Sequence, residues 1–122
     1  MSRTVAITGG RGFIGRRLVA RHVALGDRVR VLARGVADPP WGGDVEILSG
    51  DLTSSEPERL QRFAQGADAL YHCAAERQDA SRMSAVNVEG TRRLLAAAAG
   101  NIGRWVQLSS LGVYGQIGRA HV

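Results

Sequence analysis

The chain has 122 residues, a formal net charge of +5 and an apolar fraction of 44%, which suits one small domain with a hydrophobic core. Cys73 is the only cysteine, so an internal disulfide and a multi-cysteine metal site are excluded, and we expect no metal. No apolar run is long enough to cross a membrane, and no secretory signal is visible. These features favour a cytoplasmic protein without a membrane partner.

All sixteen basic residues are arginine, and the chain contains no lysine. A P-loop lysine, a Schiff-base lysine and a Tyr-x-x-x-Lys pair are therefore excluded within this chain. The arginines are scattered over the expected helices and are not interleaved with aromatic residues. The positive charge alone does not indicate nucleic acid, and we expect no nucleic-acid partner.

Short β-type runs alternate with helical stretches along the whole chain. In chain order we expect strand Thr4–Thr8, helix Phe13–Leu25, strand Arg28–Ala33, loop Gly35–Gly43, strand Val45–Leu48, helix Glu56–Ala64, strand Ala69–Cys73, a polar loop to about Ser81, helix Ala85–Ala99 and strand Trp105–Leu108. This alternation predicts an α/β fold, a Rossmann-type doubly wound parallel sheet in the order 3-2-1-4-5, truncated after the fifth strand. Ligands of such sheets bind at the carboxyl ends of the strands, between strands one and four.

The segment Thr8–Gly15 reads Thr-Gly-Gly-Arg-Gly-Phe-Ile-Gly and follows the apolar run Val5–Ile7. It satisfies the spacings Gly-x-Gly-x-x-Gly and Gly-x-x-Gly-x-x-Gly at once. A strand, a glycine-rich turn and a helix in this order predict a backbone site for a pyrophosphate at the helix N-terminus. The alternative is a plain strand-to-helix turn.

Five motifs, in order, resemble those of the extended short-chain dehydrogenase/reductases, also called the NAD-dependent epimerase/dehydratase family. They are Thr8–Gly15, Gly50–Leu52, Tyr71–Ala75, Asn87–Thr91 and Val106–Gly115. The resemblance covers nearly all of residues 4–115 and implies an incomplete NAD(P)-binding domain over residues 1–115. The cofactor-binding residues that it implies are Gly9, Gly12, Phe13, Ile14, Asp51, Leu52, Ala74, Ala75 and Asn87.

The resemblance also implies a role for each of these positions. The glycine turn approaches the pyrophosphate by its backbone, Asp51 accepts a hydrogen bond from the adenine amino group, and Leu52 packs on the adenine. Ala74 and Ala75 line the ribose near the nicotinamide, and Asn87 holds the loop behind the site. The alternative for Asn87 is a polar helix residue that bonds its own backbone.

Ser110 aligns with the family's catalytic serine, whose hydroxyl bonds the substrate oxygen, and Ser109 is the second choice. Both serines could instead bond the turn at a strand end. The family's general acid/base is a tyrosine followed four residues later by lysine, and this pair is absent. Neither Tyr71 nor Tyr114 is followed by lysine. We therefore expect this chain to bind a cofactor without turning over substrate.

Arg34 follows the second expected strand, about twenty residues beyond the glycine turn, where an acidic residue would bond the ribose 2′-hydroxyl of NAD. An arginine suits the 2′-phosphate of NADP, because its fork of donors matches a phosphate. The alternative is a solvated surface arginine. The sequence thus favours NADP and leaves NAD open.

The hexapeptide Ile117–Val122 resembles the translation of a short-read sequencing adapter. On this interpretation residues 116–122 are a read-through tail, to be excluded from fold reasoning. The resemblance implies a longer oxidoreductase or sugar-nucleotide epimerase/dehydratase that transfers a hydride at a carbinol or carbonyl carbon of a small-molecule substrate, with a homodimer as a further expectation. The alternative is a non-enzymatic NAD(P)-binding sensor of the same fold.

Overall fold

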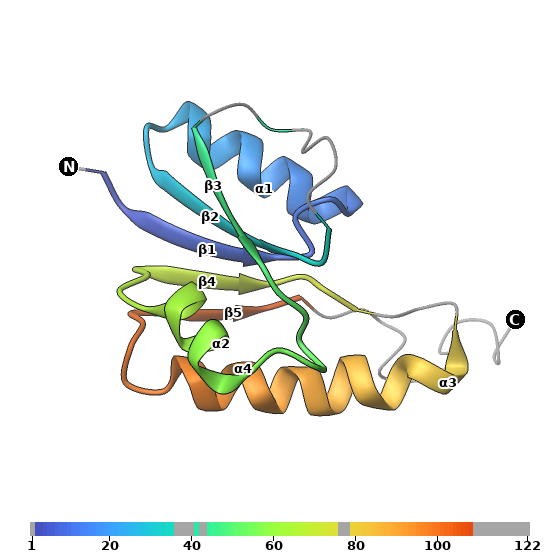
Figure 1. Ribbon diagram of the computed structural model, residues 1–122. Helices are drawn as coiled ribbons and strands as arrows, with labels where there is room; N and C mark the ends of the chain where they lie inside the picture. Colours follow the sequence, from blue (N-terminus) through green and yellow to red (C-terminus); the bar gives the residue numbers. More distant parts are fainter. Residues whose placement is uncertain (1, 36–40, 42–43, 76–78, 109–122) are drawn as a thin grey trace, which may run out of the picture.

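The computed structural model describes residues 2–35, 41, 44–75 and 79–108. Within these residues, strands and helices alternate along the chain (Figure 1). The elements are β1 (Thr4–Thr8), α1 (Phe13–Ala24), β2 (Arg28–Ala33), β3 (Val45–Ser49), α2 (Pro57–Ala64), β4 (Ala69–His72), α3 (Ala80–Met83), the π-helical segment η1 (Ser84–Gly90), α4 (Thr91–Ala98) and β5 (Trp105–Gln107). The predicted α/β fold is confirmed.

The five strands form one parallel sheet in the order β3-β2-β1-β4-β5, as the sequence predicts. The central strand β1 pairs with β2 on one side and with β4 on the other, so that Val5 stands opposite both Val29 and Ala69. From β1 the next two strands, β2 and β3, are added on one side of β1, whereas β4 and β5 are added on its other side. The strand order therefore reverses between β1 and β4. The carboxyl ends of these two strands form the crevice where ligands of doubly wound sheets bind.

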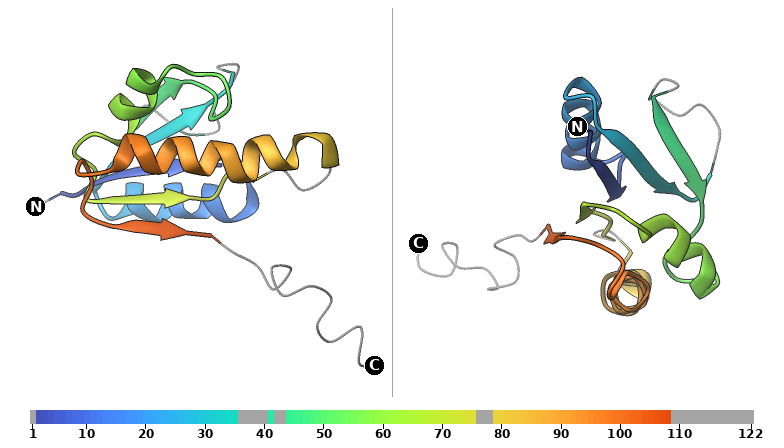
Figure 2. Two further views of the ribbon diagram at one scale, coloured as in Figure 1. Left: turned by 90° about the horizontal axis from the view of Figure 1, so that it is seen from below. Right: turned by 90° about the vertical axis from the view of Figure 1, so that its left-hand side faces the viewer.

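Helices cover both faces of the sheet, with α1 on one face and α2 and α4 on the other (Figure 2). Successive side chains along each strand point to opposite faces of the sheet, so alternate residues pack against the helices on opposite faces. In β1, Val5 and Ile7 pack in the α1 layer, whereas Ala6 packs in the layer of α2 and α4. All three are buried, because a parallel sheet between helices has no solvent-facing side at its centre.

The third helical stretch begins earlier than the sequence analysis expects. Residues 80–98 run as one continuous helix (Figure 1), whereas the prediction placed a polar loop up to Ser81 and a helix from Ala85. The side chain of Asp79 is the N-cap and accepts a hydrogen bond from the Ser81 N–H, at 3.0 Å. The expected loop residue Ser81 is therefore part of a capped first turn.

The α1 side of β5 carries exposed apolar side chains. Val106 stands opposite Tyr71 of β4, which packs in the α1 layer, so Val106 lies on that same face of the sheet. Both Val106 and the following Leu108 are exposed. Among the described residues, α1 covers the sheet near β1 and β2 but leaves this edge open.

The predictions for Ser109, Ser110, Tyr114 and the tail 116–122 lie outside the described residues. The same holds for most of the expected loop Gly35–Gly43, of which residues 35 and 41 are described.

The buried layer beneath β4 makes a direct test of the fold. Leu70 is 0% exposed, whereas Leu95 on α4 is 46% exposed. Leu70→Ala should lower the free energy of unfolding by about 2–5 kcal/mol, because it leaves a cavity in a packed core. Leu95→Ala, the matched control, should change it by less than about 1 kcal/mol. Urea unfolding followed by circular dichroism measures both, and equal losses would contradict this packing.

Candidate cofactor site

The glycine turn after β1 packs closely against the loop after β4 and against the first turn of α1. Gly9 has φ +67°, and a Cβ at this position would lie 2.7 Å from the backbone nitrogen of Ala74. A Cβ on Gly15 would overlap the carbonyl oxygen of Gly9. Glycine is therefore required at both positions, since no side chain fits between the turn, the end of β4 and the first turn of α1.

The N-terminus of α1 carries the features of an anion site. Its N-cap is Gly12, which offers no side-chain acceptor, and the first turn contains no acidic residue. The first N–H groups of a helix have no partner within the helix, and the helix dipole is positive at this end. Phe13 and Ile14 are exposed here, and the Arg17 guanidinium lies 3.8 Å from the centre of the Phe13 ring. A phosphate can approach this turn through the backbone alone.

A series of hydrogen bonds, of which the Thr8–His72 bond is buried and the others are partly buried, joins the ends of β1 and β4 to α4. The hydroxyl of Thr8 lies 2.7 Å from Nδ1 of His72, and Nε2 of His72 lies 2.9 Å from the hydroxyl of Thr91. The backbone N–H groups of Cys73 and Ala74 both donate to Thr8 Oγ1, at 3.1 Å. The loop after β4 is thus fixed to the strand that begins the glycine turn.

The donors and acceptors in this series of hydrogen bonds define the protonation state of His72. Thr8 Oγ1 already accepts two N–H groups, so its own proton points to Nδ1 of His72, and Nε2–H donates to Thr91. Burial lowers the pKa of His72 to about 4, which keeps the ring neutral. A proton on Nδ1 would leave two donors facing each other.

The loop that follows His72 presents small side chains. Ala74 is half-buried against the core, and Ala75 is exposed. Burial raises the pKa of the Cys73 thiol, so this thiol is a poor nucleophile at neutral pH. What the loop offers to a ligand is space beside the glycine turn.

Asp51, after β3, lies in a tight turn. Its Oδ1 accepts hydrogen bonds from the backbone and the hydroxyl of Thr53, at 2.8 and 2.6 Å, and its own N–H donates to Ser55 Oγ at 2.7 Å. These Thr53 bonds, with the nearby Arg34 and Arg82 guanidinium groups, lower the pKa of Asp51. The carboxylate is charged and fixed at the carboxyl end of the sheet.

Two further predicted residues lie near this turn. Arg34 is exposed just beyond the end of β2, on the same side of the sheet as Asp51. Leu52 is buried in the core beside α4, where a Cβ on Gly90 would lie 3.1 Å from its side chain. The proposed contacts of Leu52 and Arg34 with an adenosine remain predictions.

The remaining predicted residues lie on different elements. Asn87 is exposed in the π-helical segment η1. The hydroxyl of Tyr71 lies 3.1 Å from Nε2 of His22, whose Nδ1 lies 2.8 Å from an Asp27 oxygen. Tyr71 therefore connects β4 to α1 through a side-chain hydrogen bond.

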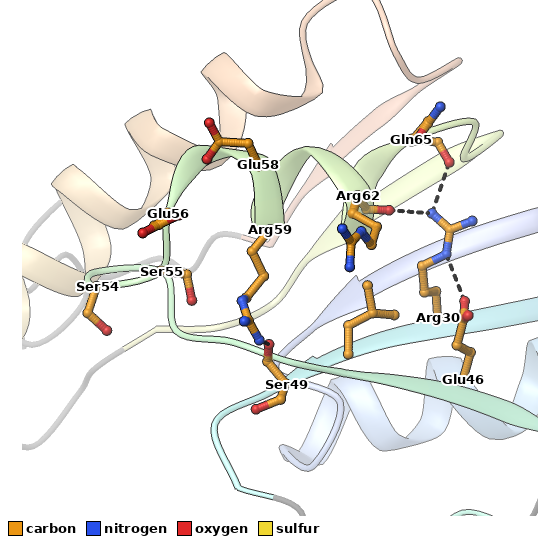
Figure 3. Close-up of a pocket in the computed structure, with 11 residues that line it drawn as sticks. Arg30, Glu46, Ser49, Ser54, Ser55, Glu56, Glu58, Arg59, Arg62 and Gln65 are labelled. Carbon is orange, nitrogen blue, oxygen red and sulfur yellow. Dashed lines mark hydrogen bonds and ion pairs between the residues drawn. The ribbon is translucent and has the colours of Figure 1, made fainter.

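A groove of about 1070 Å³ opens between β3 and α2 (Figure 3). The Arg30 guanidinium donates to the carbonyls of Arg62, Phe63 and Gln65 at the end of α2 and pairs with Glu46 at 3.2 Å. Arg59 donates to the carbonyl of Ser49 at 2.8 Å. These contacts stabilise the helix end and the edge strand, and none of the lining residues belongs to the glycine turn.

Over the part of the chain that the structure describes, no group of three or more His, Cys, Asp or Glu side chains could hold a metal ion. Over the same residues, no helix has the length and apolar character to span a membrane.

Comparison with known proteins places the chain in a family. The model of the NAD dependent epimerase/dehydratase family matches residues 5–121. The chain belongs to this family, as its five motifs indicate.

Individual relatives agree with this assignment. The chain is 38% identical over 111 residues to the ceramide reductase of Caulobacter vibrioides, covering 88% of this chain and 34% of that protein. A short-chain dehydrogenase/reductase superfamily structure from Agrobacterium tumefaciens with bound NAD matches with a TM-score of 0.77 and 36% identity, over 92% of this chain and 34% of that one. UDP-N-acetylglucosamine 4-epimerase from Bacillus cereus matches with a TM-score of 0.75 and 29% identity, over 94% and 39%. The chain spans about a third of the length of these relatives.

The residues that hold the loops in place were not predicted from the sequence. His72 and Thr91 entered only as members of the motifs Tyr71–Ala75 and Asn87–Thr91, and no role was predicted for Arg93. Thr8, His72 and Thr91 each lie within one of the family motifs. The contacts among these three residues depend on how β1, β4 and α4 meet in space, which no local sequence pattern reveals.

The neutral His72 predicts a pH dependence of stability. In the unfolded chain its pKa is about 6.5, so between pH 6.5 and 4 the unfolded state binds a proton that the folded state does not. The free energy of unfolding should fall by roughly 3 kcal/mol in total across this window, and this loss should be absent above it.

Urea titrations of the unaltered chain and of His72→Asn, from pH 7.5 to 4.5, test this expectation. His72→Asn lowers stability but should lose this acid dependence, whereas the control His22→Asn, on the α1 face, should keep it. The same slope in His72→Asn as in the unaltered chain would show that another group titrates.

Proposed function

We propose that the chain is the dinucleotide-binding part of an NAD(P)-dependent oxidoreductase or sugar-nucleotide epimerase/dehydratase. The observation that carries this proposal is the strand β1, the glycine turn and the uncapped N-terminus of α1, at the crevice between β1 and β4. The NAD named for the Agrobacterium relative supports the same cofactor class. The named relatives above are a reductase, a dehydrogenase/reductase and an epimerase, so they give no support to the sensor alternative.

The residues present fit such a cofactor. Gly12 and the N–H groups of Phe13 and Ile14 would hold the pyrophosphate, Asp51 would accept from the adenine, and Ala74 and Ala75 would leave room for the second ribose. When bound, the nicotinamide supplies the site for accepting or donating a hydride. The protein's part is to fix the orientation of that ring beside the end of β4.

The proposed catalytic role belongs to Ser110, with Ser109 as the second choice. A serine hydroxyl here would bond the oxygen of the substrate carbinol or carbonyl and orient the carbon that exchanges the hydride. A serine is a poor acid, so the proton of that oxygen needs another group, such as the family's tyrosine beside lysine. The chain has no lysine to supply this pair. The substrate would be a small molecule bound largely outside the described residues.

Arg34 supports NADP as the preferred cofactor. No acidic residue stands at this position to bond a ribose 2′-hydroxyl, and Arg34 lies on the side of the sheet where Asp51 is held. A guanidinium can donate two hydrogen bonds to a 2′-phosphate and neutralise its charge.

Gly12→Val tests the pyrophosphate site. Gly12 has φ −74° and ψ 174°, an ordinary extended conformation, and its nearest contact to an added Cβ is the Gly9 carbonyl at 3.3 Å. The Gly9 carbonyl must shift by a few tenths of an ångström for the fold to accept the substitution, and the valine side chain would occupy the approach of the phosphate. Calorimetry should give at least about a hundredfold weaker NADP⁺ binding with unchanged circular dichroism. Equal affinity in folded samples would refute the proposed site.

Arg34→Asp tests cofactor choice. The substitution replaces a phosphate-binding cation by a repelling anion, so NADP⁺ should lose about 1.5–3 kcal/mol of binding free energy and NAD⁺ much less. The NADP⁺/NAD⁺ affinity ratio, measured by titration calorimetry, is the deciding quantity. Arg28→Asp, at the opposite end of β2, serves as the control for the change in net charge. An unchanged ratio in Arg34→Asp would assign Arg34 to the solvated surface.

A further inference from the structure

The first turn of α4 contacts both loops of the candidate cofactor site. Thr91 receives the hydrogen bond from His72 and so supports the loop after β4. Two residues further on, the Arg93 guanidinium donates from Nη1 to the carbonyl of Leu52 and from Nη2 to the carbonyl of Ser55. Gly90, just before, lets the helix approach Leu52 closely. The first turn of α4 therefore holds two loops in fixed positions relative to each other, the one that contains Asp51 and the one that contains Ala74.

We propose that Arg93 is a positioning residue for the adenine half of the dinucleotide. This inference rests on the proposed function, because it concerns the Asp51 turn of the same site. Arg93 does not touch the nucleotide in this proposal. It acts by fixing Leu52 and Ser55, the two residues on either side of the Thr53 contact that holds the Asp51 carboxylate.

The chemistry of the guanidinium makes this role specific. The carbonyls of Leu52 and Ser55 both accept from Arg93, and a planar fork with donors on two nitrogens can satisfy two acceptors at once. A lysine ammonium places its charge at one point and cannot span both carbonyls in the same geometry. Ser55 also accepts from the Asp51 N–H through its hydroxyl, at 2.7 Å. Loss of Arg93 therefore frees the turn that follows Asp51 at two points, the Leu52 carbonyl and the Ser55 carbonyl.

The neighbour Arg92 provides a matched control. It lies on the same helix, one position earlier, and its side chain is exposed and pairs with Glu89 at 2.6 Å. Replacing Arg92 removes the same charge from the same helix without touching the Asp51 turn. Any effect of net charge or helix propensity should appear equally in both variants.

The experiment compares Arg93→Ala, Arg93→Lys and Arg92→Ala in the full chain. Calorimetry measures the binding of ADP and of NAD⁺, and thermal unfolding checks that each variant is folded. Arg93→Ala should bind both ADP and NAD⁺ about tenfold more weakly, by the same factor, because both share the adenine half. Arg93→Lys should lie between Arg93→Ala and the unaltered chain, and Arg92→Ala should bind as the unaltered chain does.

Chemical rescue separates positioning from a general loss of stability. Millimolar methylguanidinium should restore ADP binding to Arg93→Ala, since it can occupy the vacated fork, whereas methylammonium should not. ADP affinity unchanged in Arg93→Ala, or the same loss in Arg92→Ala, would overturn the inference, as would equal rescue by the two cations. If the unaltered chain binds none of ADP, NAD⁺ and NADP⁺ in the same calorimetry, the proposed function itself fails, and this inference fails with it.

Discussion

The hydroxyl of Thr8 connects two loops that stand 64 positions apart in the chain. It accepts the N–H groups of Cys73 and Ala74 and donates to His72, so every one of its hydrogen-bonding positions is used. The glycine turn begins at the next residue and passes so close to Ala74 that Gly9 has no space for a Cβ. This one hydroxyl group therefore fixes the loop after β4 beside the glycine turn.

The remainder of the site is arranged around this contact by the helix that follows β4. Through Thr91 it receives the far end of the His72 bond, and through Arg93 it reaches the loop after β3. The helix also packs its apolar side, including Leu94 and Ala97, into the core below the sheet. The loops at the carboxyl edge are thus fixed to a packed element, so that they are organised before a ligand arrives.

The strand order could be predicted because apolar runs, glycine turns and helical periodicities alternate cleanly along this chain. Candidate cofactor residues could be proposed from the sequence because most of them lie in short motifs at strand ends, and their contacts with a cofactor stay predictions. The start of the helix at Ala80 was missed, since the polar run before it reads as loop and only the Asp79–Ser81 contact identifies it as a cap. His72 and Arg93 could not be assigned, because their partners come from strands and loops remote in sequence.

The π-helical segment Ser84–Gly90 has a consequence for how this region tolerates changes in length. A π-helical turn contains one residue more than the α-helical turn that would replace it. Deleting one residue within it would replace the π-helical turn by an α-helical turn of the same rotation, so Ala80–Met83 would keep their facing direction relative to α4. An α-helix of unchanged length would instead rotate Ala80–Met83 by about 100° relative to α4, because each residue turns an α-helix by that amount. The π-helical segment therefore accommodates one residue that a regular helix in the same place would not, and a one-residue deletion here should be tolerated.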